Sequence, residues 1–572
     1  MKRKQHIALV MAGILLLSAV LPYSHASQTE AAAKPKLSVK KVSLILGKTK
    51  KVQVKNVKKK QLKKITWTAK NKKIVTVKKS GKLAASIKGK KTGTTKVTAK
   101  IYLKAKKKPV SAVVTVTVKK DKKPVKTPVT TPNSPAATSL PPATSGTPAV
   151  SQPPASSNKP QEDPTNILEA YDGIFKYMGT CANYYGYDEK KDQLRTRSTL
   201  DFITENFNSI TLENEMKPDA ILSSWGVGVQ TLTLSEAKEL GYYIPENYPE
   251  TKVPYLNLGT VDSTLETLKK EGLQMRGHTF VWHQQTPVEF FVKNYSGNTK
   301  VTPEVMDARL EFFVRNVMRH VMDKEKELTG SAGTLVYAWD MINEYIHRTH
   351  DATRISWHNV YGDMGLEPSY VKKAFEIAYE ELENYGVQDK VVLYYNDYDT
   401  YDCADDIVSL VNFINQDATD KNGNPVKICG GIGMQSHLCV DYPTIESYGD
   451  ALDKFLNTGL EVSISELDVS TNYAKTGETD AQGWDKWAYK DLGQTDEDQA
   501  DYIKSLMEMI VSKQKNLDRT KNQNGIAGVT IWGLYDNCSW KANTKPLLFG
   551  KSIMNPKASY YSFLDAAAIW YS

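Results

Sequence analysis

The sequence has few cysteines and no long apolar segment. Its five cysteines are too few and too scattered for a fold held together by disulfides, and an odd number leaves at least one unpaired. Cys429 and Cys439 are close enough to bridge a short loop, but sequence alone does not establish the geometry that a disulfide needs, so their pairing stays open. The apolar stretch at residues 7–21 is shorter than the roughly 18 residues that a membrane-spanning helix requires.

Acidic residues are almost absent from one part of the chain. Between Lys34 and Lys126 there are 33 lysines, no arginine and one acid, Asp121. The net charge of the whole chain is only +11, so the remainder of the chain is acidic. A basic N-terminal module therefore precedes an acidic main body, and the total charge says little about the partners of either.

The first residues are typical of an export signal. The apolar stretch follows the basic residues 2–4 and precedes Ser24-His25-Ala26, whose small first and third residues suit signal peptidase. We predict a signal peptide at residues 1–26 that is cleaved near Ala26. The protein is then secreted or associated with the cell surface, has no membrane span after processing, and does not meet nucleic acid.

Residues 35–120 alternate between apolar and polar side chains. Runs such as 74–77 and 113–118 have period two, and glycines such as Gly47 and Gly93 stand at the breaks. This pattern predicts a small all-β sandwich. Two interpretations of its lysine coat remain open: the module binds an anionic cell-wall polymer or acidic polysaccharide, or it is a soluble spacer.

Residues 121–164 are rich in proline, threonine and serine. Eleven of the 25 prolines lie between Pro124 and Pro164. Proline keeps such a segment extended, and the lack of apolar residues denies it a core. We interpret it as a linker between the two modules.

Residues 165–572 alternate between short apolar runs and amphipathic stretches. One helical pattern runs from Met306 to Val321 after Thr302-Pro303, and another begins at Ile445. Eight strand and helix units in about 400 residues predict a (β/α)8 barrel of the α/β class. The expected strands are Phe175 to Cys181, Ser209 to Glu213, Gln274 to Trp282, Leu335 to Asn343, Val391 to Asn396, Gly431 to Ser436, Glu461 to Leu467 and Ile526 to Trp532.

Reactive side chains recur at the carboxyl ends of these strands, the face on which barrel enzymes build their sites. Glu344 follows the fourth strand and Glu466 ends the seventh, and we expect these strands on opposite sides of the ring. A lone acid at such a position is more often a surface or salt-bridged group, but two in matching registry predict a facing pair. The residues that share this registry are Glu213, Trp282, Glu344, Asn396, Gln435, Glu466 and Trp532.

These motifs resemble those of glycoside hydrolase family 10. Seven blocks follow the family in order: 208–217, 276–283, 339–344, 394–398, 431–437, 464–469 and 531–540. The resemblance implies a secreted endo-1,4-β-xylanase that acts on xylan and xylo-oligosaccharides by a retaining double displacement, with Glu344 as acid/base and Glu466 as nucleophile. The N-terminal module at 35–120 resembles the bacterial Ig-like group 2 domain, on the motifs that run from Ile65-Thr66-Trp67 to 93–98.

The resemblance also implies supporting and binding roles. Asp468, Gln435 and His437 stand beside Glu466, and Asn343 bonds the 2-hydroxyl of the sugar. Asn396 and Tyr398 orient the substrate site from the fifth strand, while Trp532 and Trp540 form walls around the sugars. The residues on the glycone side are Glu213, Asn214, Lys217, His278, Trp282 and Gln285. For Trp225, Trp357 and Trp487 core packing is the better interpretation.

The connection from Glu213 to His278 is longer than is usual in the family, and it either adds a wall near the glycone subsites or is a peripheral insertion. His347 and His350 have helical spacing but no third ligand nearby, so we expect no metal, and the mechanism requires no cofactor. We expect a monomer. Two other functions compete: a related retaining barrel that acts on β-1,4- or mixed-linkage glucan, and a wall-bound adhesin with a degenerate barrel, against which the intact acids argue.

Overall fold

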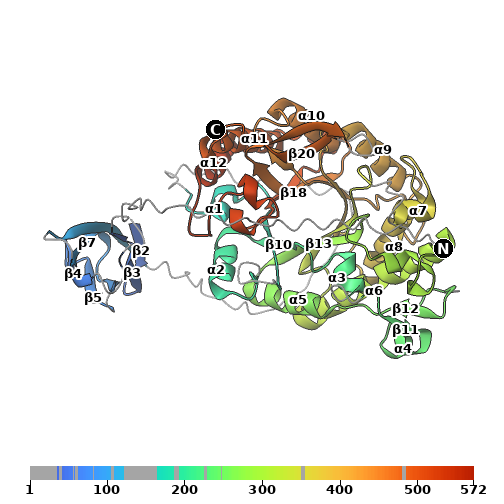
Figure 1. Cartoon of the computed structure of the whole chain (residues 1–572), viewed down its shortest axis with the longest axis horizontal. Helices are drawn as coiled ribbons and strands as arrows, with labels where there is room; N and C mark the ends of the chain where they lie inside the picture. Colours follow the sequence, from blue (N-terminus) through green and yellow to red (C-terminus); the bar gives the residue numbers. More distant parts are fainter. Residues whose placement is uncertain are drawn as a thin grey trace, which may run out of the picture. The chain divides into compact units, whose positions relative to one another are not determined.

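The computed structural model describes residues 35–37, 41–55, 57, 62–80, 83–104, 108–120, 164–185, 192–223, 228–246, 248–348, 355–479 and 485–572. The predicted signal peptide at 1–26 lies outside these residues, as does the predicted linker at 121–164 except for Pro164. The chain divides into two compact units, one within residues 1–154 and one within 155–572. Figure 1 shows the helices and strands of both units.

The N-terminal unit is the predicted small β-sandwich. One sheet has the order β1-β3-β6-β5 and the other the order β2-β8-β7-β4. All pairs are antiparallel except β2 with β8. The strands are β1 (Lys36–Leu37), β2 (Lys41–Ile45), β3 (Thr49–Lys55), β4 (Leu62–Ala69), β5 (Val75–Lys79), β6 (Ala84–Gly89), β7 (Gly93–Leu103) and β8 (Val110–Lys119).

The alternation of side chains explains this sandwich. Along β7, Val97, Ala99 and Ile101 are buried, whereas Lys96 and Lys100, which alternate with them, are exposed. Successive side chains of a strand point to opposite faces, so the apolar set meets the facing sheet and the lysines remain in water. The sequence pattern therefore predicted both the strands and the basic outer surface.

The C-terminal unit contains a closed barrel of eight parallel strands, as the sequence predicted. The ring order is β16-β15-β14-β13-β10-β9-β21-β18, and pairing of β16 with β18 closes it. A short additional strand, β17 (His437–Cys439), pairs with β18. The barrel strands are β9 (Tyr177–Ala182), β10 (Ser209–Leu212), β13 (Gln274–Val281), β14 (Val336–Asn343), β15 (Val392–Asp397), β16 (Gly431–Met434), β18 (Glu461–Ser470) and β21 (Ile526–Ile531).

Helices surround the strands (Figure 1). The two patterns identified in the sequence form α6 and α10, and Pro303 stands at the start of α6, where its missing N–H costs no hydrogen bond. No helix in the described ranges is long and apolar enough to cross a bilayer. The helices are α1 (Ile167–Tyr171), α2 (Arg197–Asn206), α3 (Pro218–Leu222), α5 (Gly259–Glu271), α6 (Pro303–Thr329), α7 (Trp357–Tyr361), α8 (Ser369–Tyr385), α9 (Ala404–Asn415), α10 (Ile445–Leu456), α11 (Asp496–Lys515) and α12 (Ala558–Ala566).

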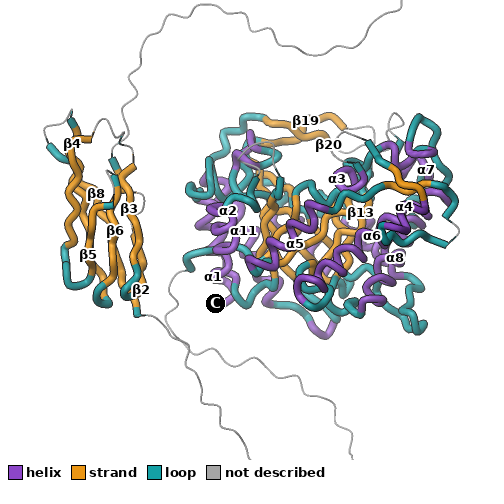
Figure 2. The backbone as a smooth tube through the Cα atoms, turned by 90° about the horizontal axis from the view of Figure 1, so that it is seen from below, coloured by secondary structure: helices purple, strands orange, loops and turns teal. Residues whose placement is uncertain are grey.

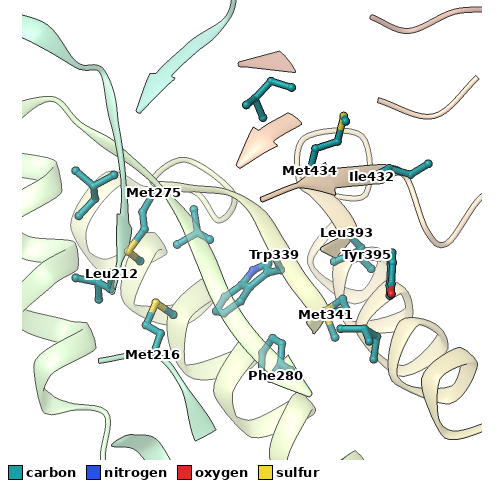
Figure 3. Close-up of a cluster of buried hydrophobic side chains, with 14 of the residues drawn as sticks. Leu212, Met216, Met275, Phe280, Trp339, Met341, Leu393, Tyr395, Ile432 and Met434 are labelled. Atoms are coloured by element: carbon teal, nitrogen blue, oxygen red, sulfur yellow. The ribbon is translucent and has the colours of Figure 1, made fainter. Parts of the chain in front are cut away.

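The main hydrophobic core lies between the strands and the helices (Figure 3). Phe280 on β13 and Trp339 on β14 pack side by side there, with ring centroids 4.8 Å apart. A Cβ atom at Gly277 would lie 2.2 Å from the Trp339 ring, so only glycine fits that position. The barrel strands also hold a buried ion pair: Nε of Arg276 lies 3.0 Å from Oδ2 of Asp340, and both side chains are buried.

In the long connection between Glu213 and His278, the part that follows Asn214 and Lys217 contains a segment that packs against α6. The connection contains β11 (Thr231–Thr233), α4 (Leu234–Glu239) and β12 (Lys252–Pro254), of which β11 and β12 pair with each other. Glu250 forms an ion pair of 2.6 Å with the fully buried Arg309 of α6. Of the two interpretations of this connection, the structure supports the peripheral insertion.

The five cysteines, Cys181, Cys403, Cys429, Cys439 and Cys538, are all buried free thiols. Cys429 and Cys439 therefore do not form the bridge that the sequence left open. The fold is held by its apolar core instead, as the low cysteine count predicted.

Candidate active site

The carboxyl ends of the barrel strands surround a cavity of about 420 Å³. Fourteen of the sixteen site residues predicted from the sequence line it, although they come from segments far apart in the chain. The parallel arrangement explains this, because all eight strands end at the same face of the barrel. The lining residues among those predicted are Glu213, Asn214, Lys217, His278, Trp282, Gln285, Asn343, Glu344, Tyr398, Gln435, His437, Glu466, Trp532 and Trp540.

Glu344 follows β14 directly and is buried. Its Oε2 accepts a hydrogen bond of 2.7 Å from Nε1 of Trp282. Its Oε1 accepts two, one of 3.1 Å from Nδ2 of Asn343 and one of 3.0 Å from Nε2 of Gln435. Glu344 has a positive φ of 60°, a conformation that few non-glycine residues adopt and that turns the chain sharply after the strand.

The pKa of Glu344 is raised above the ordinary carboxyl value. Burial is the main cause, because it penalises the charged form, and the negative charges of Asp397 and Glu466 act in the same direction. The hydrogen bonds from Gln435 and Trp282 oppose this shift without cancelling it. Glu344 is therefore suited to hold a proton at a pH at which an exposed glutamate has lost it.

Glu466 lies on β18 and is also buried. Its Oε1 accepts a hydrogen bond of 2.8 Å from Nδ2 of Asn396, and its Oε2 lies 3.2 Å from Nε2 of His437. Ser465 donates a hydrogen bond of 2.6 Å to Oδ1 of Asn396, which keeps the amide nitrogen of Asn396 directed at the carboxylate. The carboxylate is thus held from both sides.

The pKa of Glu466 is lowered, in contrast to that of Glu344. Burial alone would raise it, but the hydrogen bond from His437 and the charges of His278 and His437 outweigh burial. For His437 burial alone would lower the pKa, but the charge of Asp468, whose Oδ2 lies 2.8 Å from Nδ1 of His437, raises it to about 9. Lys541, 3.5 Å from Asp468, helps to keep the pKa of that aspartate low.

The two acids are linked through a short chain of amides. Nδ2 of Asn396 donates both to Glu466 and to Oδ1 of Asn343, at 2.8 and 2.9 Å, and Asn343 in turn donates to Glu344. β14 and β18 are separated in the ring by β15 and β16 on one side. They are therefore not diametrically opposed, as the sequence argument assumed, but their ends line one cavity.

One wall of the cavity consists of the residues predicted for the glycone side. Nζ of Lys217 donates a hydrogen bond of 2.9 Å to Gln285, and Nε2 of Gln285 donates one of 3.1 Å to Asn214. The Lys217 ammonium also lies 4.8 Å from the centroid of the Trp282 ring. These contacts preorganise several polar groups toward the same space.

Two tryptophans occupy different depths of the site. Trp532 is buried, with its ring 5.6 Å from that of His278, whose Nδ1 lies 3.0 Å from Asp340. Trp540 is 56% exposed and donates a hydrogen bond of 3.0 Å from Nε1 to Asp468. Trp532 therefore lies at the floor of the cavity and Trp540 at its rim.

Three predicted positions differ in detail. Gln435, which we placed beside Glu466, donates to Glu344 instead. Asn396 and Asp468 are fully or almost fully buried and lie behind the cavity wall, where they bind lining residues. No group of three or more His, Cys, Asp or Glu side chains within the described ranges is arranged to hold a metal ion.

The sequence missed one side of the cavity. Trp487, expected to pack in a core, lines the cavity instead, together with Tyr442 and Tyr473. Trp487 stands in a segment with no apolar periodicity, so nothing in its neighbours indicated a site. The other lining residues that the prediction omitted are Gln284, Asp399, Tyr401, Cys439 and Lys541. Trp357, by contrast, is buried as expected, and Trp225 lies outside the described residues.

Comparison with known proteins identifies relatives of the barrel. The family profile of glycosyl hydrolase family 10 matches residues 166–566. Endo-1,4-β-xylanase A of Butyrivibrio fibrisolvens is 38% identical over 386 residues, which are 67% of this chain and 80% of that protein. The bifunctional endo-1,4-β-xylanase XylA of Ruminococcus flavefaciens is 30% identical over 390 residues, 67% of this chain but only 33% of that protein.

A solved structure is also similar. The CBM22-1 and GH10 modules of the Clostridium thermocellum endo-1,4-β-D-xylanase 10B, complexed with xylohexaose, superpose with a TM-score of 0.51 at 26% identity. The match covers 72% of this chain and 69% of that one.

Proposed function

The chain belongs to glycosyl hydrolase family 10, and on this premise we propose that it is an endo-1,4-β-xylanase that cleaves internal bonds of xylan with retention of configuration. The observation that carries the mechanism is the pair Glu344 and Glu466, which line one cavity and have pKa values displaced in opposite directions. A retaining glycosidase needs one protonated and one ionised carboxyl group. The choice of xylan rests on the relatives that are named xylanases.

In the first step, Glu344 protonates the leaving oxygen while Glu466 attacks the anomeric carbon. The bond from that carbon to the leaving oxygen breaks, and an ester bond to Glu466 forms. The hydrogen bonds of the described residues occupy both lone pairs of Oε1 of Glu344 and one of Oε2. We therefore assign the transferred proton to Oε2, which has a lone pair left to carry it.

In the second step, a water molecule hydrolyses the ester. Once Glu466 is esterified, its negative charge no longer raises the pKa of Glu344. The Glu344 carboxylate can then take a proton from the water, whose oxygen attacks the anomeric carbon as the ester bond breaks. Glu344 ends this step protonated and Glu466 ionised, so the enzyme is ready for another cycle.

Asn343 is the candidate partner of the sugar 2-hydroxyl. Its Nδ2 has two hydrogens, of which one is donated to Glu344, so the other is available to a substrate. Its Oδ1 accepts bonds from both Asn396 and Gln435, which fix the orientation of the amide. A preoriented donor at this place favours the transition state, in which the 2-hydroxyl contact strengthens.

Two substitutions and one spectrum test this function. Glu466→Gln in the full chain is expected to abolish release of reducing ends from xylan, whereas Glu446→Gln, an exposed acid on α10, leaves it unchanged. Proton NMR of the first products should show the β-anomer. Unreduced turnover by Glu466→Gln, or an initial α-anomer, contradicts the mechanism. Hydrolysis of carboxymethylcellulose that is as fast as that of xylan, or faster, would favour a glucanase instead.

We also propose that the chain is exported, with the predicted signal peptide cleaved near Ala26. The basic residues 2–4 before an apolar stretch support this. Mass spectrometry of the protein recovered outside the producing cells gives the mature N-terminus. Recovery of the protein only inside the cells, with residues 1–26 intact, would contradict export.

For the sandwich we propose binding to an anionic cell-wall polymer or acidic polysaccharide. Lys64, Lys96 and Lys100 are exposed on one outer sheet, and the Lys64 ammonium lies 4.8 Å from the centroid of the Tyr102 ring. Sedimentation of the full chain with cell walls should weaken when these three lysines are changed to glutamine, and also in high salt. Sedimentation that is the same for both proteins would identify the module as a spacer.

A further inference from the structure

A hairpin extends the cavity beyond the two acids. β18, which carries Glu466, continues within a few residues into β19 (Tyr473–Thr479), and β19 pairs with β20 (Asp485–Tyr489). Both strands lie across one end of the barrel (Figure 2). Tyr473 of β19 and Trp487 of β20 line the same cavity as Glu344 and Glu466.

The hairpin stands across the barrel mouth from the predicted glycone residues. In the ring of eight strands, β18 is four positions from β13, and β16 is four positions from β10. The segments after β10 and β13 supply Asn214, Lys217 and Gln285, whereas those after β16 and β18 supply Tyr442 and the hairpin. A sugar chain that starts at the glycone wall and passes the acids therefore continues toward the hairpin.

The aromatic rings of this region form a connected wall. The rings of Trp487 and Tyr473 are nearly parallel, at 17°, with centroids 6.0 Å apart, and Tyr442 lies 5.1 Å from Trp487. Lys475, directly opposite Trp487 in the hairpin, lies 5.5 Å from its ring and forms an ion pair of 2.6 Å with Asp485. These contacts hold the indole in one orientation.

The chemistry of this wall suits an uncharged sugar. Trp487 is half-buried although its neighbours on β20 are exposed, so it does not serve a hydrophobic core. An aromatic face packs against the apolar face of a pyranose, and the indole N–H can meet a hydroxyl. Lys475 is paired with Asp485, and Lys541, whose ammonium lies 5.4 Å from the centroid of the Tyr473 ring, is paired with Asp468. Among the described residues, the wall therefore offers no unpaired lysine charge to select an acidic sugar.

We propose that Trp487 and Tyr473 form a xylose-binding site on the leaving-group side. This site binds the part of the xylan chain that departs in the first step. This inference rests on the proposed function. It makes Trp487 a specificity-determining residue that favours long substrates over short ones, without any part in the chemical steps.

The test compares two substrates with the full chain. Xylohexaose reaches both sides of the acids, whereas 4-nitrophenyl β-xylobioside places only a phenol on the leaving-group side. Trp487→Ala is expected to lower kcat/KM for xylohexaose about tenfold, the order expected for loss of one stacked aromatic contact, and to leave kcat/KM for the aryl xylobioside unchanged. Trp487→Phe should restore most of the loss. The positions at which xylohexaose is cut should also shift in Trp487→Ala.

Tyr489→Ala is the matched control, because Tyr489 is an aromatic residue of the same strand that is 54% exposed and does not line the cavity. It should leave both substrates unaffected. The inference is overturned if Trp487→Ala changes neither substrate, changes both equally, or matches Tyr489→Ala. If the unmodified chain cleaves neither substrate, the proposed function itself fails, which is a separate outcome.

Discussion

Nε2 of Gln435 donates a hydrogen bond of 3.0 Å to Oε1 of Glu344. The two residues are 91 positions apart and directly follow strands β16 and β14, which are separated in the barrel by β15. The contact makes Gln435 a neighbour of the proposed acid, and it acts against the rise in the pKa of Glu344 that burial causes. The pH range in which Glu344 keeps its proton is therefore set partly by this amide.

Gln435→Leu is expected to extend activity to higher pH. Loss of the amide donor removes a hydrogen bond that stabilises the ionised form, so the pKa of Glu344 rises. Glu344 acts in its protonated form, and the alkaline limb of kcat/KM against pH then moves upward. The profile on xylo-oligosaccharides measures this, and an alkaline limb that stays in place or moves downward would contradict this effect of Gln435 on Glu344.

Glu344→Gln separates the proposed acid from the nucleophile. On xylan, whose leaving group needs a proton, kcat/KM should fall by about 10² to 10⁴. On 2,4-dinitrophenyl β-xylobioside, whose phenolate departs without a proton, kcat/KM should be nearly unchanged. Glu466→Gln should lose activity on both substrates. Equal losses for Glu344→Gln on the two substrates would remove the assignment of Glu344 as acid.

His437 links stability to pH. Its pKa rises from 6.5 to about 9 in the folded chain, so folding strengthens proton binding there. The stability that results is fully present below about pH 6.5 and is lost as the pH rises through 9. Calorimetry at pH 6 and pH 10 should therefore show a larger fall in Tm for the unmodified chain than for His437→Gln. An equal fall in both proteins would mean that His437 does not retain its proton.

Glu250→Ala tests the peripheral position of the insertion. Removal of this acid leaves the buried Arg309 without its ionic partner, which should lower the free energy of unfolding by about 3 kcal/mol. Because neither Glu250 nor Arg309 lines the cavity, kcat/KM should not change well below the melting temperature. Glu266→Ala, which breaks an exposed pair with Lys324, is the control and should cost less than about 1 kcal/mol. A large loss of activity in Glu250→Ala would place the insertion in the substrate site.

The barrel was predictable because parallel strands buried on both faces appear as short apolar runs, and the reactive residues stand where those runs end. The hydrogen-bond partner of Gln435 was not predictable. The position of a residue in its strand indicates which end of the barrel its side chain reaches, but not which neighbouring side chain it hydrogen-bonds. Trp487 was misassigned because its place depends on pairing of β19 with β20, which a polar sequence does not reveal. The Glu250–Arg309 pair, likewise, depends on packing between distant segments.

The base of the hairpin is closed by Asn472, whose carbonyl accepts from Lys490 N at 2.9 Å and whose Oδ1 accepts from Leu492 N at 2.7 Å. Strands β19 and β20 both lie between Asn472 and Lys490 in the sequence. β18, which carries Glu466, ends at Ser470, before Asn472. Exchange of this single segment for that of another barrel would reposition the scissile bond along a polymer while the reaction itself stays intact. Under the role proposed for Trp487, product length and catalytic rate depend on different segments of this chain.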